Sequence, residues 1–477
     1  MSAAASFPWV QDYRRIAGTA AVWLYIMTLA WAPFPLGGAV AWAAGLQEIL
    51  IALCWLCWAV SAAGDPGEDW RSIRFIVVPG ALAVLALGWA CLQIIPGVPA
   101  AWVHPLWSMA SEAMGVPVDG TISINPWRTE AEILKLSSYV MAFWLAFRLG
   151  RRSETAALLL NAVIVIGAAY AIYAFALSFA GAQQTGVLYT VPFRSPFISG
   201  PFMLHNSFAT YSGLVVIAAT VKLFSLGGEA IVAGRGVRRL FLTVMEFCLG
   251  RGAFVLAAGL LAFAGVAASA SRAGFLSMLC GLIALALAAL IFLRRRSSRL
   301  WAGAGALAAA LPLLILLALN SDMLTDRVNL LLDSGTVDAT RLTLWAAARR
   351  MIADAPWLGL GLGTFEDAYP LYATQVIRNV MDKAHCDYLE FAAGLGLPAA
   401  IAFWTALLWL NTLCLKGVRQ RRRNRLYSLA AIGATVLVAV HSTVDFSLQL
   451  PAVSLLYATL LGLGVAQARS GRIATIN

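Results

Sequence analysis

His385 is the residue in this sequence best suited to acid–base chemistry. It is one of only four histidines among 477 residues, and neutral imidazole is the natural general base near pH 7. It lies in the segment K-A-H-C-D-Y-L-E, so Asp387 and Glu390 follow it closely. An isolated histidine is often structural or caps a helix. The neighbouring carboxylates and the arginine-bearing segment upstream instead favour a catalytic role.

Several arginines are candidates for binding an anion. Arg272 lies in ASASRAGFL, at a turn between two apolar segments, where it could either snorkel to the membrane surface or bind an anion there. Arg341 and Arg349 are eight residues apart and would share one side of a helix, with Arg350 beside them. Guanidinium groups bind phosphate oxygens in a bidentate manner. These arginines, with Arg194 in another polar segment, predict a site for a phosphorylated substrate.

Two further histidines lie close to the ends of apolar segments. His205 is found in FMLHNSF, and His441 precedes Asp445 in H-S-T-V-D-F. Each histidine could satisfy a helix terminus, or it could take part in substrate binding, as we predict for His441 and Asp445. No pair of histidines has the spacing of a metal motif such as H-E-x-x-H. The sequence therefore predicts neither a catalytic metal nor a cofactor.

The elements that position these residues must be membrane helices. Hydrophobic residues make up 61% of the chain and charged residues 12%, with a mean hydropathy of +0.80. This composition excludes a soluble enzyme, a disordered protein and a DNA-binding domain, and it argues against a β-barrel. It predicts an all-α polytopic membrane protein, a single integral domain over 1–477. We expect about twelve transmembrane helices, near 16–36, 40–62, 75–95, 131–149, 156–180, 199–224, 252–270, 273–293, 300–319, 388–411, 426–441 and 451–468.

The distribution of positive charge predicts the orientation of these helices. The connections on one side, such as those near Arg421 and Arg295, hold 24 of the 34 lysines and arginines, and the other ten lie opposite. Cytoplasmic connections carry the basic surplus. Both termini are therefore predicted to be cytoplasmic, and the net charge of +11 indicates contact with anionic lipid rather than with nucleic acid.

Residues 320–387 form the only long polar segment, which we expect to be a periplasmic loop. Asp338 could cap an amphipathic helix there, with Leu342, Trp345 and Arg349 at helical spacing, and Pro356 would follow its end. The glycines of G-L-G-L-G over 359–363 permit a close approach of the backbone. This glycine run lacks the strand–turn–helix context of a nucleotide-binding site.

Taken in order, these segments resemble the O-antigen ligase and polymerase superfamily. The resemblance covers about 199–400 and rests on four stretches: ISGPFMLHNSFATYSG, SASRAGFL, RLTLWAAARRMIADAPWLGLGLGTF and AHCDYLEFAAGLGLP. The tail HSTVDFSLQLPAVSLLYATLLGL matches more weakly and is more typical of polymerase-like members. Cys386 departs from the pattern, because the family often has asparagine there.

The resemblance implies a membrane glycosyltransferase of the bacterial inner membrane that needs no metal or nucleotide. Its donor would be a glycan on undecaprenyl pyrophosphate, and its acceptor the hydroxyl of a glycan or glycolipid at the periplasmic face. The arginines and the loop histidine of the family correspond to Arg272, Arg341 and His385, which would be catalytic. Substrate binding would then fall to Arg194, Arg349 and Arg350, together with His441 and Asp445.

Two alternatives remain at the level of the sequence. The glycan could be polymerised from repeat units, which is slightly favoured, or ligated to a lipid A–core acceptor. A transporter or flippase of lipid-linked oligosaccharides would also have about twelve helices. Such transporters often contain internal repeats, and we find none in this sequence.

Overall fold

The computed structural model describes residues 8–63, 73–181, 197–232, 250–292, 335–374, 382–421 and 423–469. In these ranges the regular elements are helices, beside one isolated bridge between Leu36 and Phe202. The all-α prediction is confirmed. The elements are α1 (Pro8–Trp31), α2 (Ala41–Ala62), η1 (Arg74–Ile76), α4 (Val77–Gln93), η2 (Ala100–Trp102), α5 (Leu106–Met114), α6 (Pro126–Leu149), α7 (Ser153–Phe179), α8 (His205–Val232), α10 (Arg251–Ala268), α11 (Arg272–Phe292), α14 (Gly335–Asp354), α15 (Phe365–Tyr372), α16 (Asp387–Leu395), α17 (Leu397–Gln420), α18 (Arg425–His441), η3 (Ser447–Gln449) and α19 (Pro451–Ala468).

Many of these helices are long and apolar enough to cross a membrane. Among the described residues seven meet both conditions, namely α2, η1 with α4, α7, α8, α11, α17 and α19. Helices α1, α6, α10 and α18 coincide with other predicted spans. The predicted span 300–319 lies outside the described residues. A multi-pass membrane protein is thus confirmed, whereas the count of twelve stays a prediction.

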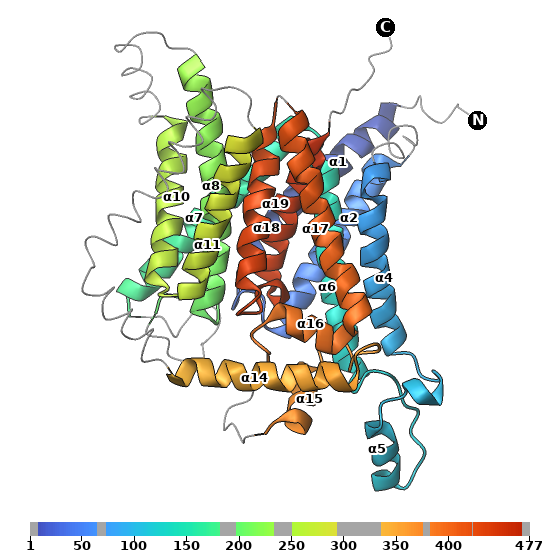
Figure 1. The fold of residues 1–477 in the computed structure, drawn as a ribbon. Coiled ribbons are helices and arrows are strands. Elements are labelled where there is room, and N and C mark those ends of the chain that lie inside the picture. Colours follow the sequence, from blue (N-terminus) through green and yellow to red (C-terminus); the bar gives the residue numbers. More distant parts are fainter. Residues whose placement is uncertain are drawn as a thin grey trace.

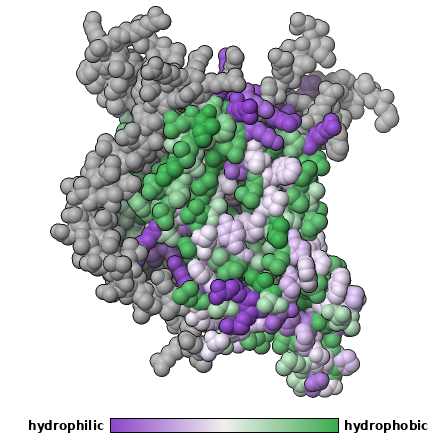
Figure 2. Space-filling model, viewed as in Figure 1, coloured by the Kyte–Doolittle hydropathy of each residue, from purple (hydrophilic) through white to green (hydrophobic). Residues whose placement is uncertain are grey.

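Helix α19 lies at the centre of the bundle, between α18 and α6 (Figure 1). All of its residues are buried. Small residues allow this close packing: a Cβ added at Gly462 would lie 2.8 Å from the Phe143 carbonyl oxygen of α6, and one at Gly464 would lie 2.3 Å from the Ala431 Cβ of α18. On the face drawn in Figure 2, an apolar surface occupies the middle of the bundle and hydrophilic residues gather toward its two ends.

The polar elements share one end of the bundle. Helix α14 lies across that end, together with α15 and α16, while α1 begins and α19 ends at the opposite end (Figure 1). We call the first the α14 end. The sequence assigned this end to the periplasm, and that assignment stays a prediction.

Two element boundaries differ from the sequence expectation. The predicted span 388–411 is broken, because Gly396 adopts a φ of +77° between α16 and α17, and Pro398 is the second residue of α17. The short helix α16 therefore belongs to the α14 end. Helix α14 begins at Gly335, before Asp338, and Leu342 is 56% exposed. Its buried side is formed by Leu344, Ala347, Ala348 and Met351.

The glycine run 359–363 makes the close approach that its composition predicts. Gly359, Gly361 and Gly363 all have positive φ. A Cβ on Gly359 would lie 2.2 Å from the Gly394 carbonyl oxygen, and the Leu360 N–H donates to the Ala393 carbonyl at 2.9 Å. On the other side, the Gln93 amide donates to the carbonyls of Leu358 and Gly394. The run therefore joins α16 to the end of α4.

Candidate active site

His385 forms a hydrogen-bonded pair with Asp445 at the α14 end. Its Nδ1 lies 3.2 Å from Oδ1 of Asp445, although 60 residues separate the two in sequence. The Asp445 side chain is 2% exposed, whereas that of His385 is 27% exposed. A buried carboxylate next to Nδ1 favours the tautomer in which Nδ1 carries the proton. The partly exposed side of the ring is then a proton acceptor at Nε2.

The backbone of His385 is held in an uncommon conformation. Its φ is +50°, a region that residues other than glycine rarely adopt. The indole N–H of Trp345, from α14, donates to the His385 carbonyl at 3.3 Å, and the Phe446 ring packs edge-on against the imidazole at 5.0 Å. Backbone strain of this kind persists only where surrounding contacts impose it. The orientation of His385 is therefore set by the fold.

Asp387 joins the His385 segment to the segment after α18. It is fully buried, and its carboxylate accepts from Ser442 Oγ at 2.7 Å, from the Leu448 N–H at 3.2 Å and from Gln449 Nε2 at 3.1 Å. Its own N–H donates to the carbonyls of Ser442 and Asp445. These bonds bring Asp445 and His385 together. The sequence alone did not identify Asp387 or Gln449 as site residues.

The pKa values of the Asp445 and Asp387 carboxyls are shifted in opposite directions. Burial acts to raise the pKa of Asp445, but the hydrogen bond from His385 and the proximity of His441 and His385 lower it to about 2. Burial raises the pKa of Asp387 to about 7, against the lowering effect of the Ser442, Leu448 and Gln449 hydrogen bonds. Asp445 is thus the carboxylate that stays charged beside His385.

Arg341 and two more histidines complete the cluster. Arg341 is one helical turn before Trp345, and it lies within electrostatic reach of the imidazoles of both His205 and His441. His205, at the start of α8, has its Nδ1 2.8 Å from the Ser269 carbonyl oxygen. His205 was not among the site residues predicted from the sequence, although its position at a span end was a usable signal.

Arg272 follows Ser269 by three residues, as the first residue of α11. Ala270 in this turn has a φ of +55°, and Ser271 Oγ accepts from the Gly274 N–H at 3.1 Å, so the hydroxyl caps the helix. The exposed Arg272 side chain thus starts from a fixed backbone. A helix N-terminus also favours a bound anion. The contact from His205 to Ser269 connects this turn to α8.

The described basic residues at the α14 end fall into two groups. Arg128, Lys135, Arg350 and Lys383 are bonded to acidic groups or carbonyls of the fold. Arg272, Arg341 and Arg349 have no hydrogen-bond or ion-pair partner among the described residues. Anion binding by the second group stays a prediction. Arg350 instead donates to the Tyr372 carbonyl and connects α14 to α15.

The remaining predicted residues have separate outcomes. Arg194 lies outside the described residues. His441 is fully buried, and its Nδ1 is 2.6 Å from Ser447 Oγ, so in this conformation the ring braces the 441–449 segment. Substrate contact by His441 stays a prediction. Across the ranges that the structure describes, no three His, Cys, Asp or Glu side chains gather as a metal site would require.

Comparison with known families gave one match. A family model described as O-antigen ligase matches residues 257–404. This match supports the resemblance of the chain to the O-antigen ligase and polymerase superfamily. It also supports a glycosyltransferase-like role in the membrane. A search of curated proteins gave no match.

The matched segment contains only part of the cluster. It includes Arg272, Arg341 and His385, whereas His205 precedes it and Asp445 follows it. The hydrogen bond between His385 and Asp445 therefore connects the matched segment to a region beyond it. The geometry extends the candidate site further than the family match does.

Proposed function

We propose that this protein transfers or polymerises a glycan from an undecaprenyl-pyrophosphate carrier onto an acceptor sugar hydroxyl at the periplasmic face of the inner membrane. The observation that carries the proposal is the His385–Asp445 pair at the same end of the bundle as Arg272 and Arg341. A base and arginines that have no partner among the described residues suit a glycosyl transfer from a pyrophosphate. The proposed transfer uses no metal or cofactor.

His385 acts as the general base in this mechanism. Its Nε2 accepts the proton of the acceptor hydroxyl while the acceptor oxygen forms a bond to the anomeric carbon of the donor. Asp445 holds the Nδ1 proton and stabilises the imidazolium that results. Because attack and departure are in line, the product is inverted at the anomeric carbon.

The arginines act on the leaving group. The bond between the anomeric carbon and the phosphate oxygen breaks, and its electron pair passes to undecaprenyl pyrophosphate. Arg272 and Arg341 neutralise the charge that develops on those oxygens. Arg349, exposed two turns further along α14, extends the positive surface toward the glycan. Arg194 and Arg350 stay predicted contributors to glycan binding.

Polymerisation of repeat units is our first choice of reaction, since the His441–Asp445 tail resembles polymerase-like members. Ligation to lipid A–core is the second candidate, and the description of the matching family supports it. Both use the same donor chemistry and differ in the acceptor. Glycan gels from a deletion strain separate them. Loss of long chains with single repeats still attached indicates a polymerase, and loss of all attached glycan indicates a ligase.

The central test is the His385→Ala variant, assayed after purification with lipid-linked glycan from the producing bacterium. We expect transfer to fall by about 10²- to 10⁴-fold, because general-base catalysis contributes that much. His104→Ala is the matched control. His104 lies between α4 and α6, where its Nδ1 accepts from the Leu106 N–H. Retained transfer in His385→Ala would remove this histidine from the mechanism, and a purified protein that forms no glycosidic bond would favour a transporter.

A further inference from the structure

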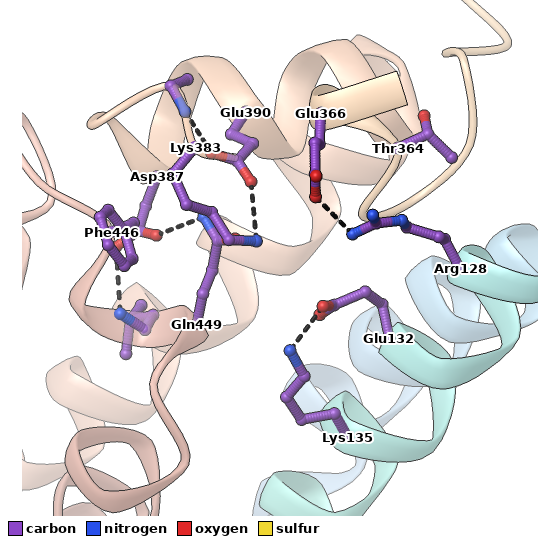
Figure 3. A network of polar contacts seen from close by, with 12 residues as sticks. Arg128, Glu132, Lys135, Thr364, Glu366, Lys383, Asp387, Glu390, Phe446 and Gln449 are labelled. Atoms are coloured by element: carbon purple, nitrogen blue, oxygen red, sulfur yellow. Dashed lines mark hydrogen bonds and ion pairs between the residues drawn. The ribbon is translucent and has the colours of Figure 1, made fainter. Parts of the chain in front are cut away.

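A second network of charges lies beside the proposed base, and it involves no residue that the mechanism uses. Lys383 Nζ is 3.3 Å from Glu390 Oε1 and 2.6 Å from Gln449 Oε1 (Figure 3). The Lys383 side chain is 17% exposed and that of Glu390 is 5% exposed. A buried lysine with two oxygen partners has a defined position. It therefore fixes the elements that supply those oxygens relative to each other.

The two partners of Lys383 bond to residues on either side of His385 in the sequence. Glu390 Oε2 accepts from the N–H of Ala384, the residue directly before His385, at 2.8 Å. Gln449, the other partner of Lys383, donates to Asp387, two residues after His385, at 3.1 Å. The strained backbone of His385 is therefore tied on both sides through one ammonium group. The segment that holds Asp445 is tied to the same group by Gln449.

A separate ion pair on helix α6 lies beside the network. Arg128, Glu132 and Lys135 follow one side of its first turns, and Glu132 pairs with Lys135 at 2.5 Å (Figure 3). A Cβ on Gly363 would lie 2.1 Å from Glu132 Cγ, so the glycine run packs against this side chain. Burial acts to lower the pKa of Lys383, but Glu390 and then Glu132 outweigh it and raise the pKa. Lys383 therefore stays charged at the junction of three segments.

We propose that Lys383 is a positioning residue for His385, acting through Glu390 and Gln449 to hold the imidazole against Asp445. Lys383 itself touches neither substrate nor the reacting atoms. This inference rests on the proposed function of His385. Loss of the Lys383 side chain should lower kcat and leave the KM for donor and acceptor nearly unchanged, since the arginines proposed to bind substrate remain in place.

The experiment must separate misplacement of His385 from misfolding. Lys383→Met alone leaves the buried Glu390 charge unpaired, which is strongly destabilising. The double variant Lys383→Met/Glu390→Gln removes both charges and keeps an oxygen that can accept from the Ala384 N–H. Lys135→Met is the matched control. Lys135 is 18% exposed and pairs with one glutamate, but it makes no hydrogen bond to the His385 segment.

We expect the double variant to purify as a folded protein with a kcat lower by about 10²-fold, the size of effect that a displacement of roughly 1 Å can cause. In Lys135→Met, kcat should stay within about twofold of the parent value. A double variant with parental kcat, one that fails to fold, or one whose KM rises while kcat is kept would overturn the positioning role. An equal loss of kcat in Lys135→Met would also overturn it.

The same assay includes His385→Ala, so the two proposals fail separately. If His385→Ala is inactive and the double variant is fully active, only the role of Lys383 is lost. If His385→Ala keeps its activity, the proposed function itself fails, whatever the Lys383 variants do.

Discussion

The chemistry proposed for His385 depends on a single carboxylate oxygen. Oδ1 of Asp445 accepts from the Phe446 N–H at 2.9 Å and lies 3.2 Å from His385 Nδ1, so it is fixed by the backbone of its own segment. This geometry selects the imidazole tautomer with a free Nε2. A change of one atom at this position should therefore remove the base without removing the side chain.

Asp445→Asn tests that dependence. The asparagine amide can donate to Nδ1, so the imidazole proton would be on Nε2. A protonated Nε2 cannot accept the proton of the acceptor hydroxyl. We expect kcat to fall by about 10²- to 10⁴-fold at unchanged protein yield. Steady-state transfer assays provide the measurement. Asp382→Asn is the control, because this exposed carboxylate makes no hydrogen bond to the histidine. A full-activity Asp445→Asn variant would show that the tautomer does not matter.

Asp387 makes a prediction about stability rather than rate. Its pKa in the fold is raised to about 7 from an ordinary value of 3.8. The stability that it contributes is therefore fully present below the unfolded value and is lost as pH rises through about 7. Melting temperatures of the parent and of Asp387→Asn are measured in detergent from pH 4 upward. The melting temperature should fall as pH rises from about 4 to about 7, and the fall should be steeper in the parent. Parallel pH profiles would contradict the pKa shift.

At the scale of elements, the site depends on how closely α16 and the glycine run approach each other. The run 359–363 contacts the backbone of Gly394 and Gly396. Its neighbour Pro356 accepts from the Leu397 N–H at 2.8 Å, at the break between α16 and α17. Since α16 begins with Asp387, a shift of the glycine run would be transmitted to the His385 segment.

Gly359→Ala should be among the most destabilising single substitutions at the α14 end. Its φ of +72° alone costs an alanine about 1 kcal/mol or more, and the added Cβ would also overlap the Gly394 carbonyl and the Gly396 nitrogen. Gly115→Ala is the matched control, because Gly115 has a φ of +68° with open space around it. Melting curves in detergent should show a clearly larger loss for Gly359→Ala. Equal losses would mean that only φ matters.

The sequence predicted the helices better than it predicted their packing, and the chemistry that it assigns stays a prediction. His385, Arg272 and Arg341 were found because histidine and arginine beside a membrane are rare and costly. Helical spacing grouped Leu342 with Trp345 and Arg349, but it did not show that the buried side of α14 contains Leu344 instead of Leu342. Hydropathy also merged α16 with α17, because it cannot detect the turn at Gly396.

Other site features could not be predicted from local patterns. The contact of Lys383 with Gln449 joins residues 66 apart, and that of His385 with Asp445 spans 60. Such pairs depend on the crossing of α18 and α19 beside α16, which no short motif encodes. The contact of His205 with the Ser269 carbonyl also joins residues far apart, with a separation of 64 in the sequence.

At the scale of the whole molecule, the positive charges have two distinct uses. The 24 basic residues on one side are predicted to orient the chain, and of the ten opposite, seven are described by the structure. Four of those seven have partners at the α14 end, such as Glu366 for Arg128. The other three, Arg272, Arg341 and Arg349, are those that we propose for an anionic ligand. The proposed anion site thus involves three of the 34 basic residues.

This interpretation requires the α14 end to face the periplasm, and cysteine labelling tests it. Leu342→Cys lies on the exposed side of α14, and Gln420→Cys is exposed at the end of α17, at the opposite end of the bundle. With a membrane-impermeant thiol reagent on intact spheroplasts, the first should be labelled and the second only after permeabilisation, because basic connections stay in the cytoplasm. The parent chain, with its own cysteines, gives the background. The reverse pattern would place the arginines on the side away from the acceptor and would contradict the proposed reaction.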